Sequence, residues 1–360
     1  MNNKLYWGLP LVPVTIGAPF LLPARETLIF ALSAASMIPL AGLLSDATES
    51  LATRTGPTLG ALLNVTFGNA GELIIGFFAM RAGLQQVVKA SLTGSILVNL
   101  LLTLGVSMIA GGLRHKTLQF NALAARTRST MLGLAAISLI SPAAYHFLGG
   151  SNLASRETDL SLEFAAILLI IYVLSLLFTL HTHKQLLAPE NDESSKRNEE
   201  WSTRTALGVL ALSAVLAGWM GEILVSSVES AAHALGLTDL FVGLVVVAIA
   251  SNSAESTSAI RAAVCNHMDL AVGIAVGSSI QIALFVAPIL VVASHWIAPR
   301  PIDLVFTPIE VLALILSIGI TMQIAGDGDS NWLEGAQLVV VYVLLAVMVF
   351  SLPPRSLVTR

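Results

Sequence analysis

Two short motifs in this 360-residue chain carry the side chains best suited to chemistry. Residues 68–72 read Gly-Asn-Ala-Gly-Glu and residues 251–255 read Ser-Asn-Ser-Ala-Glu, and each motif lies in a long apolar stretch. In both, an Asn stands three residues before a Glu, so on a helix the amide and the carboxyl share one face. An ionisable side chain inside a membrane span is costly and by default marks a functional site. Two matched motifs therefore predict one site.

The two motifs together supply only oxygen ligands: carboxylates, side-chain amides, hydroxyls and the carbonyls freed where a helix is irregular. Hard cations prefer such ligands, and Ca²⁺ takes about 6–8 of them at ~2.3–2.6 Å. Neither motif contains the Cys or His that a softer metal would favour. The candidate cation ligands are Glu72, Glu255, Asn69, Asn252, Gly68 and Ser251.

The same two carboxylates could not stay charged in an empty, buried site. Burial and mutual repulsion both disfavour a pair of adjacent ionised carboxyl groups. The site should therefore either hold a divalent cation or take up protons. We hypothesise that Glu72 and Glu255 bind Ca²⁺ and H⁺ in turn, so that they also couple proton movement to transport.

Other polar residues in neighbouring segments are secondary candidates. Those in the segments that follow the motifs would orient the glutamates or bond helices together; they are Ser95, Asn99, Ser278 and Gln281. Acidic residues toward the ends of the preceding segments would form a vestibule that concentrates cations; they are Asp46, Glu49, Glu222 and Glu229.

The composition predicts an all-α polytopic membrane protein. The chain is 55% hydrophobic and 11% charged, whereas soluble domains average roughly 25% charged residues. A helix needs about 20 apolar residues to cross a bilayer. The sequence offers eleven such stretches: Leu5–Leu22, Thr27–Leu44, Pro57–Met80, Val87–Ala110, Met131–Leu148, Leu162–Leu180, Ala206–Val225, Leu240–Ile260, Ala271–Ile297, Leu304–Ile324 and Ala336–Leu352.

An internal repeat relates the two halves. An offset of 183 residues carries Glu72 onto Glu255 and also pairs Gly60 with Gly243 and Gly94 with Gly277, without a gap. Five spans on each side of a hydrophilic stretch would give two inverted repeats, the construction of many secondary transporters. We expect an N-terminal transmembrane helix (1–26), a first five-helix repeat (27–183), a hydrophilic cytoplasmic linker (184–204) and a second five-helix repeat (205–360).

The distribution of basic residues predicts the orientation. With a cytoplasmic N-terminus, 11 of the 18 Lys and Arg residues face the cytoplasm, as the positive-inside rule favours. We expect a multi-pass protein of the bacterial plasma membrane whose partners are the lipid bilayer and the transported Ca²⁺ and H⁺. A net charge of −4 gives no basic surface for nucleic acid. No cofactor is expected, and a homo-oligomer is left open.

The motifs also resemble those of a known family. Residues 68–72, the Gly-Ser-Ile-Leu-Val-Asn-Leu run at 94–100 and the Gly-Ser-Ser-Ile-Gln-Ile-Ala-Leu run at 277–284 are similar to those of calcium/proton exchangers, a branch of the cation/calcium exchanger superfamily. The resemblance implies eleven spans, two inverted repeats and a calcium site built by the paired glutamates. In the second motif, Ser251, Ser253 and Ser256 stand where that family commonly has Gly, Ala and His.

Three alternatives stay open at this point. The same architecture could exchange Na⁺ for Ca²⁺ or Mn²⁺ for H⁺, although neither motif has the Thr-Ser run with Pro that sodium/calcium exchangers tend to carry. An intramembrane acid/base hydrolase could use two carboxylates, but no HExxH or GxSxG motif is present. A channel would not need proton-titratable ligands. We therefore predict a secondary active antiporter and not an enzyme.

Overall fold

The computed structural model describes residues 5–22, 25–55, 57–149, 156–182, 201–326 and 328–352. The first half contains η1 (Leu5–Gly8), α1 (Leu11–Leu21), α2 (Glu26–Thr55), α3 (Pro57–Gly68), α4 (Ala70–Arg81), α5 (Gln85–Leu97), η2 (Val98–Thr103), α6 (Leu104–Gly112), β1 (Leu118–Gln119), α7 (Ala122–Gly149), α8 (Glu157–Leu177) and η4 (Phe178–Thr182). The second half contains α10 (Thr203–Leu235), α11 (Asp239–Phe241), η6 (Val242–Val247), α12 (Ala248–Ser251), α13 (Ser253–Val264), α14 (Met268–Gln281), η7 (Ile282–Val286), α15 (Ala287–Ile297), α16 (Pro308–Ala325), β2 (Asp329–Ser330) and α17 (Trp332–Phe350).

Nearly all of this structure is helical, which confirms the predicted class. Among the described residues, eight helices are long and apolar enough to cross a membrane, and two further bent pairs raise the number to ten if each pair counts as one span. The apolar helix over Tyr6–Leu21 is shorter. The polytopic helical class is therefore established, whereas the count of eleven spans stays a prediction. Two loops meet in a short antiparallel pair, Leu118 with Ser330 and Gln119 with Asp329.

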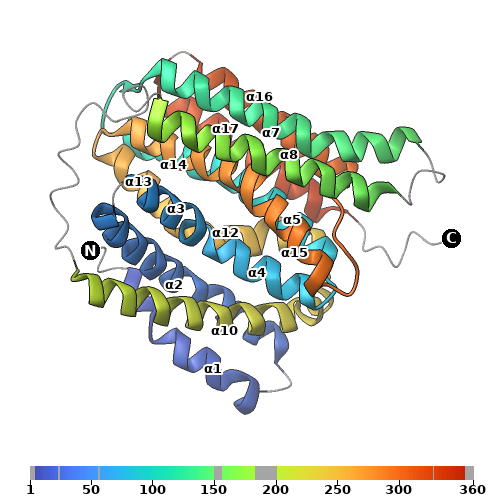
Figure 1. The fold of residues 1–360 in the computed structure, drawn as a ribbon. Coiled ribbons are helices and arrows are strands. Elements are labelled where there is room, and N and C mark those ends of the chain that lie inside the picture. The colour runs from blue at the N-terminus through green and yellow to red at the C-terminus, as the bar shows by residue number, and fades with distance from the viewer. Residues whose placement is uncertain are drawn as a thin grey trace.

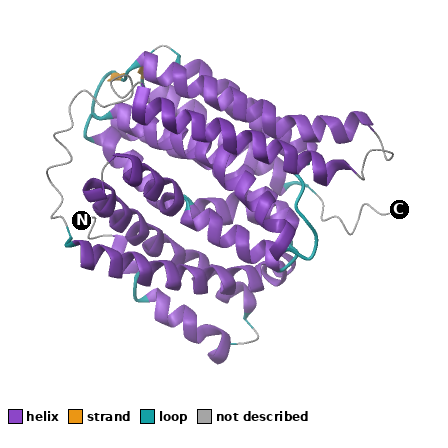
Figure 2. Cartoon of the chain, viewed as in Figure 1, coloured by secondary structure: helices purple, strands orange, loops and turns teal. Residues whose placement is uncertain are grey.

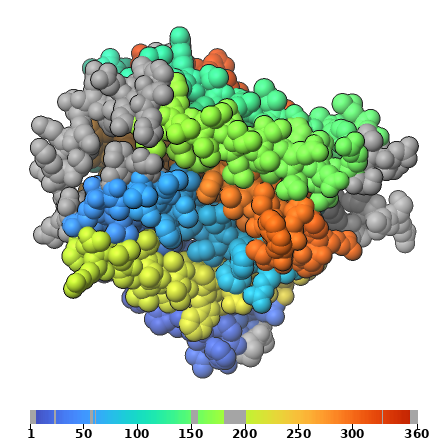
Figure 3. All heavy atoms as spheres, in the orientation of Figure 1, coloured from blue at the N-terminus to red at the C-terminus, as the bar shows by residue number. Residues whose placement is uncertain are grey.

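The helices form a bundle with the broken helices in its interior (Figures 1 and 2). On one side, α2 packs along α10, and α1 lies against both on the outside. On the other side, α7, α8, α16 and α17 cover α5–α6 and α14–α15. The strip formed by α3 and α4 runs between α10 and the α8–α15 side on the face seen in Figure 3.

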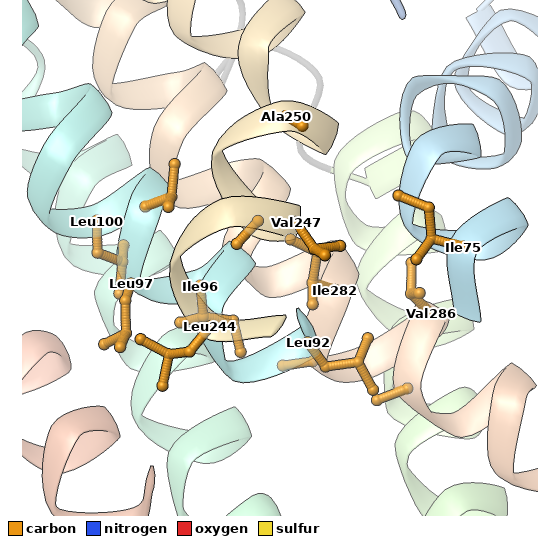
Figure 4. Close-up of a cluster of buried hydrophobic side chains, with 14 of the residues drawn as sticks. Ile75, Leu92, Ile96, Leu97, Leu100, Leu244, Val247, Ala250, Ile282 and Val286 are labelled. Atoms are coloured by element: carbon orange, nitrogen blue, oxygen red, sulfur yellow. The ribbon is translucent and has the colours of Figure 1, made fainter. Parts of the chain in front are cut away.

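The continuous helices α5–α6 and α14–α15 form the centre of the bundle. Their most apolar windows are 83% and 67% buried, against 22% for the peripheral helix at Glu157–Leu180. Apolar side chains from α4, α5, η6 and η7 interlock there, among them Ile75, Ile96, Leu244 and Ile282 (Figure 4). This packing holds the elements that carry the polar motifs in register.

Two helices are longer than the apolar stretches predicted within them. We placed spans at Thr27–Leu44 and Ala206–Val225, but α2 continues to Thr55 and α10 to Leu235. Hydropathy reports only the apolar part of a helix, while the backbone hydrogen bonds continue until a stop signal. In α10 the stop is Gly236, which adopts a left-handed conformation with φ 67°.

The division of the chain into two repeats and a linker stays a prediction. Most of the hydrophilic linker, 184–204, lies outside the described residues. The helices on either side of it correspond one to one in order: α2 with α10, α3–α4 with α11–α13, α5–α6 with α14–α15, α7 with α16, and α8 with α17.

Candidate cation site

Each motif breaks its helix at the asparagine. Asn69 separates α3 from α4 with a bend of 52°, and Asn252 separates α12 from α13 with a bend of 57°. Their backbones are alike, with φ/ψ of −104°/26° and −91°/13°. Each amide Nδ2 donates to the carbonyl four residues earlier, at 3.1 Å to Val65 O and 2.8 Å to Ala248 O. This side-chain bond competes with the backbone ladder and favours the break.

The breaks place both glutamates at helix N-termini. Glu72 and Glu255 lie in the first turns of α4 and α13. Backbone N–H groups at a helix start lack partners within the helix, so this end favours negative charge. The sequence therefore puts each carboxylate where the backbone can partly compensate its burial.

The two breaks meet in the interior of the bundle. A Cβ added at Gly71 would lie 3.4 Å from both Cβ and O of Ser251, so the start of α4 touches the end of α12. Glu72 is only 6% exposed, and Glu255 is half-buried. Along the chain, Glu72 directly follows Gly71 and Glu255 stands four residues after Ser251, so both carboxyls belong to the turns next to this contact. The motifs predicted to converge do lie together.

Amide and hydroxyl groups link the breaks to the central helices. Asn69 Nδ2 donates to Gln281 Oε1 at 2.7 Å, and Asn99 Nδ2 donates to Asn252 Oδ1 at 2.9 Å. Asn252 Nδ2 also donates to Ser95 Oγ at 2.7 Å, and Ser95 Oγ lies 3.5 Å from Glu72 Oε1. Each motif therefore contacts a polar residue from the other half of the chain.

Two π-helical segments lie beside these contacts. η2 begins one residue before Asn99, and η7 begins directly after Gln281. π-turns inside longer helices are frequent at functional sites. Three of the four predicted orienting residues, Ser95, Asn99 and Gln281, thus reach the site. Ser278 is half-buried, and its side chain makes no hydrogen bond within the described part of the chain.

Some buried oxygens at the site have no hydrogen-bond partner among the described residues. They are Glu255 Oε2 and Asn99 Oδ1. Buried polar atoms in proteins nearly always have a hydrogen-bond partner, so an unpartnered oxygen indicates a position that an ion or a proton could occupy. In the described ranges no cluster of three or more His, Cys, Asp and Glu side chains offers another metal site.

Of the four residues predicted to form a vestibule, one lies beside the site and three are exposed. Asp46 accepts a hydrogen bond from the Tyr6 hydroxyl and lines a cavity of ≈ 30 Å³ with Ala254 and Thr257, directly beside Glu255. Glu49 is exposed one turn further along α2. Glu222 and Glu229 are exposed on α10, and neither side chain forms a hydrogen bond or ion pair in the part of the chain that the structure describes.

Along the helix axes, the bundle is packed differently on the two sides of the site. We call the end where α3 and α10 begin and α13 ends the linker end. Away from it, α5 docks on η6 so closely that a Cβ at Gly94 would lie 2.2 Å from Leu244 O. Toward it, α3 packs on α2, and a Cβ at Gly277, the repeat partner of Gly94, would meet no described atom within 4 Å. The linker half is therefore loose beside α14 and the opposite half is closed.

The family follows from a comparison with known sequences. The family model described as "Sodium/calcium exchanger protein" matches residues 26–181 and 205–351, which is most of the chain and leaves out the linker region. The chain belongs to this family. The predicted membership of the cation/calcium exchanger superfamily is confirmed.

Individual relatives within the family show which named transporters the chain is similar to. The chain is 41% identical to a "Ca(2+)/H(+) antiporter" of Aphanothece halophytica over 98% of both chains. It is 42% identical to the "Ca(2+)/H(+) antiporter ChaA" of Bacillus subtilis over 91% of this chain and 93% of the relative. The solved Ca²⁺/H⁺ antiporter YfkE superposes with a TM-score of 0.84 at 37% identity, covering 98% of this chain and all of that one. These relatives are transporters, which confirms that the chain is not an enzyme.

Sequence reasoning missed a hydroxyl pair next to the site. Thr103 Oγ1 and Ser256 Oγ lie 2.5 Å apart, bridging η2 to the first turn of α13. In the sequence, Ser256 stands out only because the family motif commonly has His at this position. Nothing in the sequence pairs it with Thr103, because the two are 153 residues apart.

Proposed function

We propose that this protein is a secondary active antiporter that exchanges Ca²⁺ for H⁺ by alternating access, with Glu72 and Glu255 holding the cation and the protons in competition. The observation that carries the proposal is the convergence of two half-helix N-termini, each with a glutamate in its first turn, around buried oxygens that have no hydrogen-bond partner among the described residues. Relatives about 40% identical that are named Ca²⁺/H⁺ antiporters support the choice of ions.

Charge neutrality explains the coupling. Two carboxylates balance either one Ca²⁺ or two protons, so each loaded site is neutral, whereas the empty site carries two negative charges. Moving uncompensated charge through a low-dielectric interior is expensive. The protein should therefore change its access only when the site is loaded, which ties cation movement one way to proton movement the other way.

The proposed ligands are the side chains and carbonyls that the two breaks bring together. Glu72 and Glu255 supply carboxylates, Asn69 and Asn252 supply amides, and the carbonyls of Gly68 and Ser251 are candidates at the ends of the preceding helices. Asn99 adds a buried amide oxygen that has no hydrogen-bond partner in the described ranges. These oxygens are of the type and number that Ca²⁺ accepts.

The unequal packing of the two halves supports alternating access. In this state η6 leans on α5, while the repeat-equivalent α3 leans on α2 and away from α14. Exchanging these two arrangements would close the linker half and open the other. With the N-terminus in the cytoplasm of a bacterial cell, as the basic residues favour, the linker end is cytoplasmic and this state is the one open to the cytoplasm.

A second candidate keeps the architecture and changes an ion. The family model is described by sodium/calcium exchange, and Mn²⁺ accepts the same oxygen ligands as Ca²⁺. Na⁺/Ca²⁺ and Mn²⁺/H⁺ exchange therefore belong in the same experiment.

The test uses the full chain in lipid vesicles. After an imposed pH jump, Ca²⁺ uptake is followed with and without Na⁺, and with Mn²⁺ in place of Ca²⁺. We expect uptake of Ca²⁺ driven by the pH gradient alone, lost in Glu72→Gln and in Glu255→Gln and kept in Glu163→Gln, which changes a carboxyl on α8 outside the site. Uptake that persists in both site variants refutes the proposed role of the glutamates. Strict dependence on Na⁺ selects the second candidate.

A further inference from the structure

We propose that Thr103 and Ser256 are a positioning pair that fixes the helix break at Asn252 and, through it, both glutamates. The inference deepens the proposed function and rests on it. Thr103 is fully buried on η2, and Ser256 follows Glu255 directly in α13. Their hydroxyl oxygens are 2.5 Å apart, and Ser256 Oγ is 2.8 Å from Asn252 O.

The directions of these bonds follow from proton counting. A serine hydroxyl has one proton to donate, and the carbonyl of Asn252 can only accept. Ser256 therefore donates to Asn252 O, and Thr103 donates to Ser256 Oγ. Asn99, four residues before Thr103, donates to Asn252 Oδ1 at 2.9 Å. The segment η2 thus holds both the side chain and the backbone of the residue at which the helix breaks.

From Asn252 the hydrogen bonds continue to the Glu72 carboxylate, and the backbone continues to Glu255. Asn252 Nδ2 donates to Ser95 Oγ, which lies 3.5 Å from Glu72 Oε1. Glu255 stands in the first turn of the helix that starts after Asn252. A change at Thr103 therefore alters the distance and direction between the two carboxylates without touching either.

The first repeat has no such pair. At the repeat offset of 183 residues, Ser256 corresponds to Leu73 and Thr103 to Val286, both apolar. Within the described ranges, one side-chain hydrogen bond, from Asn69 to Gln281, bridges the break at Asn69 to the second half of the chain. The break at Asn252 is therefore held by more hydrogen bonds than the break at Asn69. We infer that it fixes the position of Glu255, and that Glu72 must lie at the right distance from it.

The test compares hydroxyl loss with hydroxyl retention in the full chain in vesicles. Thr103→Val keeps the shape and loses the donor, Ser256→Ala loses its partner, and Thr103→Ser keeps the bond. We expect Thr103→Val and Ser256→Ala to raise the KM for Ca²⁺ about 3- to 10-fold, the size of one buried hydrogen bond. Vmax should change less than about twofold, and the double variant should be no worse than either single one because both remove the same interaction. Thr103→Ser should restore the KM.

Controls separate this role from simple helix packing. Ser279→Ala removes another fully buried hydroxyl, whose one hydrogen bond among the described residues is to Ala275 O at 2.9 Å, and should leave the KM unchanged. A wild-type KM in both Thr103→Val and Ser256→Ala overturns the inference, as do additive effects or a Thr103→Ser variant as impaired as Thr103→Val. If Thr103→Val does not assemble, the KM and pH profile of Ser256→Ala decide the matter alone. Absence of transport in the unaltered protein would refute the proposed function itself, a different outcome from neutral variants of a working transporter.

Discussion

Gly94→Ala is predicted to disrupt the closed half of the bundle. The added Cβ would lie 2.2 Å from Leu244 O, 2.6 Å from Leu244 Cα and 2.7 Å from Leu244 C, all backbone atoms. Relief of these overlaps requires α5 and η6 to separate by about 1 Å, and overpacking of this kind typically costs about 1–3 kcal/mol. That cost disfavours the present state by roughly 5- to 150-fold relative to one in which the two helices are apart.

Gly277→Ala is the matched variant in the other repeat. Its Cβ would meet no described atom within 4 Å in this state, so the methyl group should cost nothing here. In the opposite state, α3 would approach α14 and the same overlap would arise. The two substitutions are chemically identical and repeat-equivalent, and they should therefore act on opposite states.

The assay combines thermal unfolding in detergent with the initial rate of Ca²⁺ exchange in vesicles. We expect Gly94→Ala to lower the Tm by about 1–4 °C, the shift that about 1–3 kcal/mol gives in a chain of this length, and to slow exchange. Gly277→Ala should leave the Tm within about 0.5 °C and still slow exchange at least fivefold. A wild-type Tm in Gly94→Ala would refute the tight contact, and full exchange in Gly277→Ala would refute the idea that the halves trade arrangements.

Three further outcomes are expected. Lys89→Met should lower the Tm in thermal unfolding by an amount equivalent to about 3 kcal/mol. The reason is that Lys89 is 7% exposed and donates to Asp303 Oδ1 and Val305 O at 2.8 Å each. The control Lys116→Met changes an exposed lysine and should leave the Tm unchanged. Lowering the pH on the side from which Ca²⁺ binds should raise the KM for Ca²⁺, by up to tenfold per pH unit for each competing proton, and a pH-independent KM would contradict competition at the site. Asp46→Asn should raise the KM about two- to threefold at low ionic strength, and the difference should vanish at ~1 M salt, since a vestibule acts through long-range attraction that salt screens.

The sequence was sufficient to predict the elements that carry the site. An Asn three residues before a Glu in an apolar stretch, repeated at a constant offset, predicted two helix segments that would meet, and the approach of Gly71 to Ser251 agrees with it. Local chemistry explains this success, because the amide of each asparagine bonds within its own helix. Asn99 and Gln281 were singled out because amides deep in a membrane need partners.

What the sequence could not supply depends on contacts between distant segments. Asn99 and Gln281 occupy positions that differ by one residue between the repeats, and only the structure shows that each bonds to the asparagine of the other half. The unequal packing at Gly94 and Gly277 could not be predicted either, since equivalent residues give equivalent expectations. Thr103 was missed because an isolated threonine in a membrane helix usually bonds to its own backbone.

The most direct measurement is proton release on cation binding. Purified protein in weakly buffered detergent at about pH 7 is titrated with Ca²⁺ while the free proton concentration is followed with an indicator dye. We expect Ca²⁺ to displace protons from the unaltered protein, and we expect Glu72→Gln and Glu255→Gln each to reduce both the proton release and the Ca²⁺ binding. Tight Ca²⁺ binding across the pH range in which the protein exchanges protons, with no proton release, would contradict this expectation.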